Sequence, residues 1–295
     1  MLAWMTYRKV GICETFFLGK KMNALAARMG NSVQYRSTAP LSDEQIMRVA
    51  PSVFAEEAHA SRSDRYTYIP TIEVIRGLRK EGFEPFMVAQ AHTRIPGKAE
   101  YTKHMLRMRH AGQINTSEAQ EIILINSHDG TSSYQLLAGE FVFVCCNGLV
   151  TGNKMADIRI RHKGDIVSDV IQGAYDVIDG FGLIREVKGE MKSITLSRPE
   201  QHLFAETALS LKYDGETAPI QPVQLLRPRR MEDADDTLWK TFNRVQENVI
   251  RGGLAGYNAN GRRVRTREVT AIDSDLKLNR ALWTLAEKMA ELKQA

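Results

Sequence analysis

One segment of the chain gathers residue types that could perform acid–base chemistry. Residues 126–134 hold an imidazole, a carboxylate and several hydroxyls, with His128 and Asp129 adjacent. Such a pair could serve a hydrolase or a nuclease, with a metal held by carboxylates elsewhere. The same residue types also build tight turns, and Asp129-Gly130 is a strong hairpin signal. We therefore predict that His128 and Asp129 shape a turn and do not catalyse, and catalysis is the alternative.

Arginine and lysine side chains offer a second kind of chemistry, which is phosphate binding. A strand over residues 157–163 would send its cations to one face and its isoleucines to the other, and residues 103–109 alternate similarly. Residues 251–267 contain five arginines and no acidic residue. The candidate nucleic-acid-binding residues are Lys103, Arg107, Arg109, Arg159, Arg161, Lys163, Arg251, Arg262, Arg263, Arg265 and Arg267.

The glycine-rich segment 251–267 has two interpretations. Arginine binds phosphate through two parallel hydrogen bonds and glycine permits close approach, which favours contact with a nucleic-acid backbone. Alternatively, the segment is a solvated basic loop that pairs with acidic residues nearby, such as Glu232, Asp233, Asp235 and Asp236.

Composition sets broad limits on function. Lys and Arg number 40 against 35 Asp and Glu, a net charge of +5 that is compatible with a polyanionic partner. The three cysteines suggest no disulfide framework, which favours a reducing compartment. No apolar run approaches the roughly 20 residues that a membrane-spanning helix needs. We expect a cytoplasmic protein without a membrane partner.

Several sequence motifs of known chemistry are missing. The chain has no phosphate-binding Walker loop, no Gly-x-Gly-x-x-Gly after a strand, no Gly-x-Ser-x-Gly and no His-Glu-x-x-His. The adjacent cysteines Cys145 and Cys146 lack the spacing of a zinc site and are expected in the core. We therefore expect no cofactor and no metal.

Hydrophobic spacing predicts an α+β fold. Short β-rich runs separated by turn residues predict a central, mainly antiparallel sheet over about residues 83–162. Helices precede and follow it, and we expect them on one face of the sheet. The expected strands include Phe86–Ala89, His104–Arg109, Ile122–Ile125, Tyr134–Leu137 and Phe141–Val144. The expected helices include residues 71–81, 166–180, 199–212, 237–251 and one from Asp275 onward.

The domain prediction separates an N-terminal extension from the rest. Residues 1–21 lack clear periodicity, so we expect either a disordered extension or an arm packed on the domain, and Met22 is an alternative start. Removing residues 1–21 should leave a folded protein. Residues 22–295 are expected to form a single α+β domain with a flexible Arg/Gly-rich loop at about 251–270.

Long strings of the sequence resemble a known family, domain of unknown function 932. The resemblance extends from about Met22 almost to the C-terminus and implies a protein carried by prophages and plasmids of bacteria. It implies no reaction and no catalytic or ligand residue. The strings that carry it are Arg65–Thr71, Thr102–Arg107, Glu121–Gln135, Cys146–Val150, His162–Asp165, Gln246–Asn248, Gly252-Gly253 and Asp275–Trp283.

Three hypotheses for function follow from these observations. The leading one is a non-enzymatic accessory protein of a mobile element that binds nucleic acid, in particular single-stranded DNA. The second is a hydrolase or nuclease centred on His128 and Asp129. The third is an interaction protein that inhibits a host enzyme.

Overall fold

The computed structural model divides into two compact units. The first unit holds the described residues up to 149 together with 157–178, and the second holds 150–151 and the described residues from 179 onward. The expectation of a single domain stays a prediction. The predictions for residues 1–21, for a start at Met22 and for Cys145 and Cys146 concern parts of the chain outside the described residues. The structure describes residues 32–57, 59, 68–95, 97–114, 118–142, 147–151, 157–213 and 218–294.

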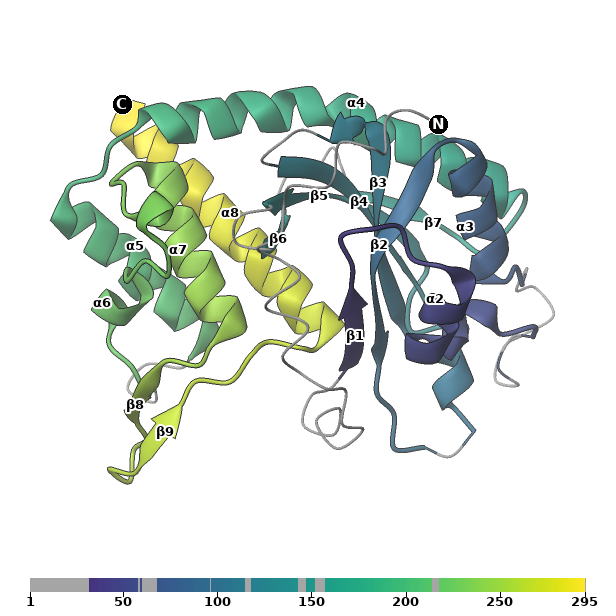
Figure 1. Cartoon of the computed structure of the whole chain (residues 1–295), viewed down its shortest axis with the longest axis horizontal. Coiled ribbons are helices and arrows are strands. Elements are labelled where there is room, and N and C mark those ends of the chain that lie inside the picture. The colour runs from purple at the N-terminus through teal and green to yellow at the C-terminus, as the bar shows by residue number, and fades with distance from the viewer. Residues whose placement is uncertain are drawn as a thin grey trace. The chain divides into compact units, whose positions relative to one another are not determined.

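A seven-stranded sheet forms the centre of the first unit (Figure 1). Its strand order is β1-β2-β3-β4-β5-β6, and β7 pairs with β5. Each pairing with a described register is antiparallel, so the predicted α+β fold with a mainly antiparallel sheet is confirmed. The strands are β1 Ser32–Arg36, β2 Phe83–Ala91, β3 His104–Ile114, β4 Glu118–Asn126, β5 Tyr134–Val142, β6 Asn147–Val150 and β7 Asp157–Ile160.

The hairpin predicted at Asp129-Gly130 joins β4 to β5. Ile122 lies opposite Ala138, and Gly130 adopts a φ of 79° in the connecting turn. Two strands were expected after this turn, but β5 is continuous. The reason is Gly139, which lies inside the strand: a Cβ there would meet the Ile123 side chain at 2.8 Å, so the glycine permits close packing and makes no turn.

Helices cover one face of this sheet. Thr71 of α3 contacts side chains of β3 and β4, and Gly77 of α3 lies against α4. Gly173 of α4 lies against Leu136 of β5 and Ile158 of β7, which places α4 over the same face. The helical elements of this part are α2 Asp43–Val49, η3 Pro51–Phe54, α3 Thr71–Lys80, η4 Ala99–Tyr101 and the beginning of α4 Ile166–Ser193.

Helix α4 is longer than the sequence pattern predicted. We expected it to end near Gly180, but it continues to Ser193. Buried Phe181 and Ile184 follow Val177 at helical spacing, so the apolar face persists beyond the glycine. A single glycine weakens a helix by only about 1 kcal/mol, which such packing overrides.

The second unit is mainly helical. Its core includes Phe242 of α7 and Trp283 of α8, whose rings meet edge to face with centroids 5.9 Å apart. Among the described residues, no helix has the length and apolar composition needed to cross a membrane. The elements are α5 Arg198–Lys212, α6 Pro222–Leu225, η7 Met231–Asp233, α7 Leu238–Arg251, β8 Ala255–Tyr257, β9 Arg263–Arg265 and α8 Ile272–Gln294.

Candidate nucleic-acid interface

The arginine-rich segment after α7 forms a hairpin of β8 and β9. Asn258 closes its tip, because its Oδ1 accepts hydrogen bonds from the backbone of Asn260 (3.1 Å) and Arg262 (2.9 Å). Gly261 adopts a φ of 70° beside it, which favours glycine. Our expectation of a flexible loop at about 251–270 is therefore replaced by a hairpin with a hydrogen-bonded tip.

One face of the hairpin is docked on the proline-rich connector, residues 218–230, which includes α6. The backbone N–H of Tyr257 donates to the carbonyl of Pro219 at 2.9 Å. Gly256 lies so close that an added Cβ would be 1.8 Å from the same carbonyl oxygen. Val264 pairs with Gly256 and shares its face. The hairpin is thus held from behind by backbone contacts that require glycine.

The opposite face is open and cationic. Tyr257 lies across from Arg263, and Ala255 lies across from Arg265. Because side chains alternate along a strand, these four residues share one face. Tyr257 is 66% exposed. The arginines Arg262, Arg263, Arg265 and Arg267 are exposed, and none forms an ion pair with a carboxylate in the described part of the chain.

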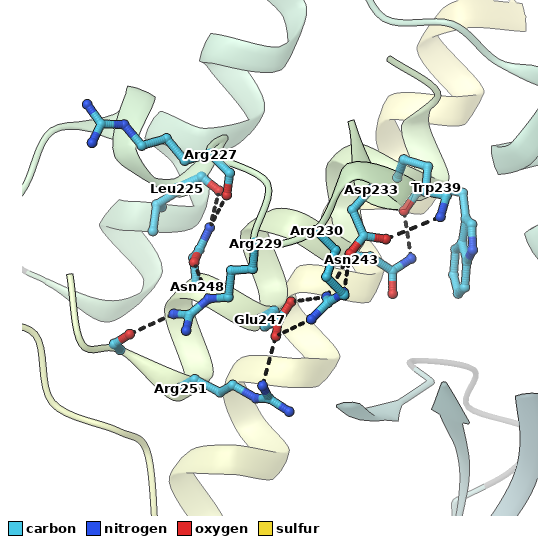
Figure 2. A network of polar contacts seen from close by, with 12 residues as sticks. Leu225, Arg227, Arg229, Arg230, Asp233, Trp239, Asn243, Glu247, Asn248 and Arg251 are labelled. Carbon is cyan, nitrogen blue, oxygen red and sulfur yellow. Dashed lines mark hydrogen bonds and ion pairs between the residues drawn. The ribbon is translucent and has the colours of Figure 1, made fainter. Parts of the chain in front are cut away.

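A polar network fixes the end of α7, where the hairpin begins (Figure 2). Glu247 is almost fully buried and accepts from Arg230 and from Arg251, the latter at 2.9 Å. Arg251 therefore differs from the arginines of the hairpin, because its guanidinium is engaged by a carboxylate within its own helix. Its role in the structure is to hold the last turn of α7.

Asn248 and Arg229 tie the proline-rich connector to the same helix end. The side-chain amide of Asn248 donates to the carbonyls of Leu225 (2.9 Å) and Arg227 (3.0 Å). Arg229 donates to Oδ1 of Asn248 at 2.8 Å, as Figure 2 shows. It also donates to the carbonyl of Gly252 at 2.7 Å. These contacts set the position from which the hairpin projects.

One residue of the acidic segment, Asp233, is paired with cations close to it in the chain. Asp233 pairs with Arg230 at 2.6 Å and with Lys240 at 3.2 Å. The contacts of Asp233 therefore do not support the alternative interpretation, in which nearby acidic residues neutralise the basic segment. The hairpin arginines keep their charge available to a partner.

The cations around β7 form a second exposed group. Arg159 is 64% exposed at its side chain, while Ile158 and Ile160 lie toward α4, so the predicted alternation holds here. Arg159 lies 3.6 Å from Asp157. Arg161 and Lys163 are exposed just beyond the strand. Lys103 is partly exposed before β3.

Arg107 and Arg109 do not belong to an exposed surface. Their side chains are at most 1% exposed, and both pair with buried Glu121, at 3.0 and 2.9 Å. The Arg109 guanidinium is also stacked between the rings of Phe86 (4.3 Å) and Phe141 (4.2 Å). The cationic face expected over residues 103–109 is therefore wrong for these two residues, because the face that carries them is buried.

Glu121 is ionised in this environment. Burial by itself raises the pKa of a carboxyl, but Arg109 and Arg107 outweigh it and hold the pKa of Glu121 below its ordinary value. The carboxylate and the guanidinium groups are thus a structural ion cluster, with no part of it open to a phosphate.

The pair His128 and Asp129 lies in the turn between β4 and β5, as predicted. Asp129 accepts from the backbone N–H of Thr131 (3.0 Å) and from its hydroxyl (2.6 Å), and it pairs with Lys98 at 3.2 Å. His128 is buried and directs its Nε2 to the hydroxyl of Thr71 at 3.2 Å. The carboxylate and the imidazole therefore have separate partners.

A second buried imidazole continues this chain of hydrogen bonds. Ser52 donates its hydroxyl proton to Gln90 (2.8 Å), so its oxygen accepts from Nδ1 of His104 (2.9 Å). Nε2 of His104 is then an acceptor and takes the hydroxyl proton of Thr71 (2.8 Å). Thr71 has no second proton to give, and Nε2 of His128 therefore donates to its oxygen.

This arrangement is poorly suited to acid–base catalysis. Burial lowers the pKa of His104 to about 3 and that of His128 to about 4, so both imidazoles are neutral and weakly basic at pH 7. Thr71 has no exposed surface through which a substrate could reach it. In the described residues, no group of three or more His, Cys, Asp or Glu side chains could hold a metal ion. The catalytic assignment of His128 and Asp129 stays untested.

Comparison with known proteins identifies the family. The profile of the family described as Domain of unknown function (DUF932) matches residues 58–283. The chain is a member of the DUF932 family. Two relatives in Escherichia coli (strain K12), UPF0380 protein YafZ and UPF0380 protein YfjQ, are each 50% identical to this DUF932 chain over 268 residues, covering 91% of it and 98% of each relative. No solved structure matches it.

The strings by which the sequence resembles DUF932 supply much of its buried polar framework. Glu121–Gln135 contributes Glu121 and His128, and Gln246–Asn248 contributes the residues that anchor the connector. The connector arginines Arg229 and Arg230 were missed, because sequence gives no sign that they reach α7. The hairpin had a partial signal in the sequence: β9 alternates as Arg263-Val264-Arg265, and turn residues that include Gly261 precede it.

Proposed function

We propose that this DUF932 protein binds nucleic acid through the open face of the β8–β9 hairpin. The observation that carries the proposal is a group of exposed arginines that have no carboxylate partner among the described residues: Arg263 and Arg265 on this face, Arg262 at the tip and Arg267 just beyond β9. Guanidinium groups without a carboxylate partner can each bind a phosphate oxygen without first breaking an ion pair. A hairpin with a docked back and a closed tip presents them in a fixed arrangement.

The surroundings of the hairpin support the same partner. Arg227 is exposed on the connector that carries the hairpin. The net charge of +5 favours encounter with a polyanion. Arg107 and Arg109 are excluded from this interface by burial, and Arg251 acts within α7. Arg159, Arg161 and Lys163 remain candidates for a separate contact.

Binding by these side chains would be independent of base sequence. Arginine contacts to phosphate fix the register of a protein on a strand but carry no sequence information. A role as an accessory factor in replication, recombination or evasion of host defence, within a prophage or plasmid, is the biological setting that the family resemblance suggests. Neither hydrolysis nor inhibition of a host enzyme has a comparable feature in its favour.

The test compares two variants with equal loss of charge. One replaces Arg262, Arg263 and Arg265 with Ala. The control replaces three exposed cations of the first unit with Ala, namely Arg48, Lys80 and Arg94. Affinities for labelled single-stranded and double-stranded oligonucleotides are measured at low salt. If each exposed contact contributes about 0.5–1 kcal/mol, the hairpin variant should bind roughly 10- to 150-fold more weakly than the parent.

The control should retain the parent's affinity, because its lost charges belong to the other compact unit and none of them is part of the hairpin. Equal weakening of both variants would mean that only overall charge matters, and the hairpin would not be the interface. A parent protein that binds no oligonucleotide at low salt would refute the proposed function.

A further inference from the structure

We infer that the ligand of the hairpin is single-stranded nucleic acid and that an unpaired base stacks on the ring of Tyr257. This inference rests on the proposed function and adds the kind of strand and the residue that selects it. Three features carry it, namely the exposure of the ring, the cations on the same face and the rigidity of the support.

The ring of Tyr257 is exposed without an evident structural reason. It is 66% exposed, and within the described residues it makes no aromatic or cation–π contact. By contrast, Trp239 and Trp283 of the same unit are at most 4% exposed. The backbone of Tyr257, and not its ring, holds the hairpin to Pro219. An uncovered aromatic face of this kind is available to a ligand.

Cations flank the ring on the same face. Arg263 lies directly across from Tyr257, and Arg265 is the next residue along that face. Ala255 pairs with Arg265 on this face and carries only a methyl group, so it leaves the ring of Tyr257 uncovered on that side. Successive nucleotides place a flat base beside a phosphate, so a ring next to guanidinium groups matches one base and its neighbouring phosphates.

The hairpin is also rigid enough to act as a platform. Its tip is closed by Asn258 and its back is pressed on Pro219 through Gly256. A group that is already fixed loses less conformational freedom when it binds. The open face contains no large aliphatic side chain, so its chemistry fits a charged, aromatic ligand better than an apolar protein surface.

The ring favours single strands over duplexes for a physical reason. Bases in a duplex already stack on each other and offer only their edges to a protein. Stacking on Tyr257 would require a base to leave the duplex, which costs a few kcal/mol. In a single strand the bases are accessible, and stacking on an aromatic side chain tolerates any sequence.

The test compares variants of Tyr257 and, for each variant, ligands that differ in their accessible bases. Tyr257→Leu removes the aromatic face, and Tyr257→Phe retains it as the matched control. The ligands are an intact DNA or RNA single strand, an abasic DNA strand of equal length with the same phosphates, and the matched duplex. Tyr257→Leu should bind the intact strand about 5- to 150-fold more weakly than the parent, the loss expected for one stacked base.

The other expected results follow from the loss of one base contact. Tyr257→Phe should match the parent, and the parent should prefer the intact strand to both the abasic strand and the duplex. Tyr257→Leu should bind the abasic strand as the parent does, and its salt dependence should be unchanged. Because the abasic comparison can be made with the parent alone, it holds even if Tyr257→Leu folds poorly.

Two outcomes would overturn the inference while leaving the proposed function in place. One is equal affinity of the parent for intact, abasic and duplex ligands, with the arginine variant still weakened. The other is a loss in Tyr257→Leu that is the same on intact and abasic strands, which would mean that the ring supports the hairpin. Absence of all binding by the parent would instead refute the proposed function.

Discussion

Buried ionisable side chains in the first unit are each held in one charge state by their neighbours. Glu121 is ionised because two guanidinium groups meet it. His104 and His128 are neutral because they are buried. The hydroxyl of Thr71 donates its proton to His104, and its oxygen accepts from Nε2 of His128. The buried polar residues of the sheet therefore stabilise the fold, and the exposed residues of the hairpin are the candidates for binding a partner.

The buried imidazoles predict that the protein loses stability in mild acid. Unfolding releases both histidines to a pKa near 6.5, while folding holds their pKa values at about 3 and about 4. Between pH 6.5 and about 4 the unfolded state therefore binds more protons, and stability falls as pH falls. Each imidazole contributes up to about 1.4 kcal/mol per pH unit.

Urea unfolding between pH 5 and 6.5 measures this slope, in a range where ordinary carboxylates stay ionised. His104→Gln should reduce the slope by up to about 1.4 kcal/mol per pH unit. His92→Gln is the matched control, because His92 is exposed. A slope in His104→Gln equal to that of the parent would mean that His104 is protonated in the folded state.

Alternation along a strand predicted which residues share a face, but not which face is exposed. At β7 the inference was right: Arg159 is exposed and Ile160 is buried. At β3 the same reasoning failed, because Glu121 on β4 provides a buried counter-charge for Arg107 and Arg109. The pairing of β3 with β4 places Glu121 beside the two arginines and so determines that their face is buried, and no local sequence pattern predicts that pairing.

The position of the β8–β9 hairpin depends on the close approach of the Gly256 backbone to the carbonyl of Pro219. Gly256→Ala would place a methyl group 1.8 Å from the Pro219 carbonyl oxygen, so the hairpin must move away from the connector. We expect a loss of about 1–3 kcal/mol in stability, as for overpacked sites, together with weaker nucleic-acid binding. Thermal unfolding and oligonucleotide binding measure the two effects.

Gly189→Ala is the matched control for this substitution. Gly189 lies within α4, and an added Cβ there would meet nothing within 4 Å. Alanine should stabilise the helix by about 0.5–1 kcal/mol and leave binding unchanged. If Gly256→Ala proved as stable as the parent and bound equally well, the docking of the hairpin on Pro219 would be irrelevant to the interface.

Elements with a strong local signal were predictable from the sequence, and elements that depend on long-range pairing were not. Helix α5 matches its prediction closely, because Ser197 and Glu200 form a capping box that marks its start. Strand β1 was missed, because its pairing with β2 is long-range and its sequence has no strong alternation. The contacts that dock the hairpin were also unpredictable, since they join residues far apart in the chain.

For the molecule as a whole, the open question is whether the two compact units unfold together. Helix α4 is continuous from Ile166 to Ser193 and contributes residues to both units, so we expect a single transition. Trp239 and Trp283 report only on the second unit. In a Trp4→Phe background, fluorescence and far-ultraviolet circular dichroism should give the same midpoint. Separate midpoints would indicate two independently folding units.

The salt dependence of binding tests the central claim most directly. Each phosphate contact adds about 0.9 to the slope of log affinity against log salt on duplex DNA, and about 0.7 on single strands. Replacing Arg262, Arg263 and Arg265 with Ala should therefore flatten the slope by about 2.1 on single strands, or about 2.7 on a duplex, if all three contact phosphate. The variant with Arg48, Lys80 and Arg94 replaced should keep the slope of the parent. A slope unchanged in the hairpin variant would contradict the assignment of this hairpin as the nucleic-acid interface.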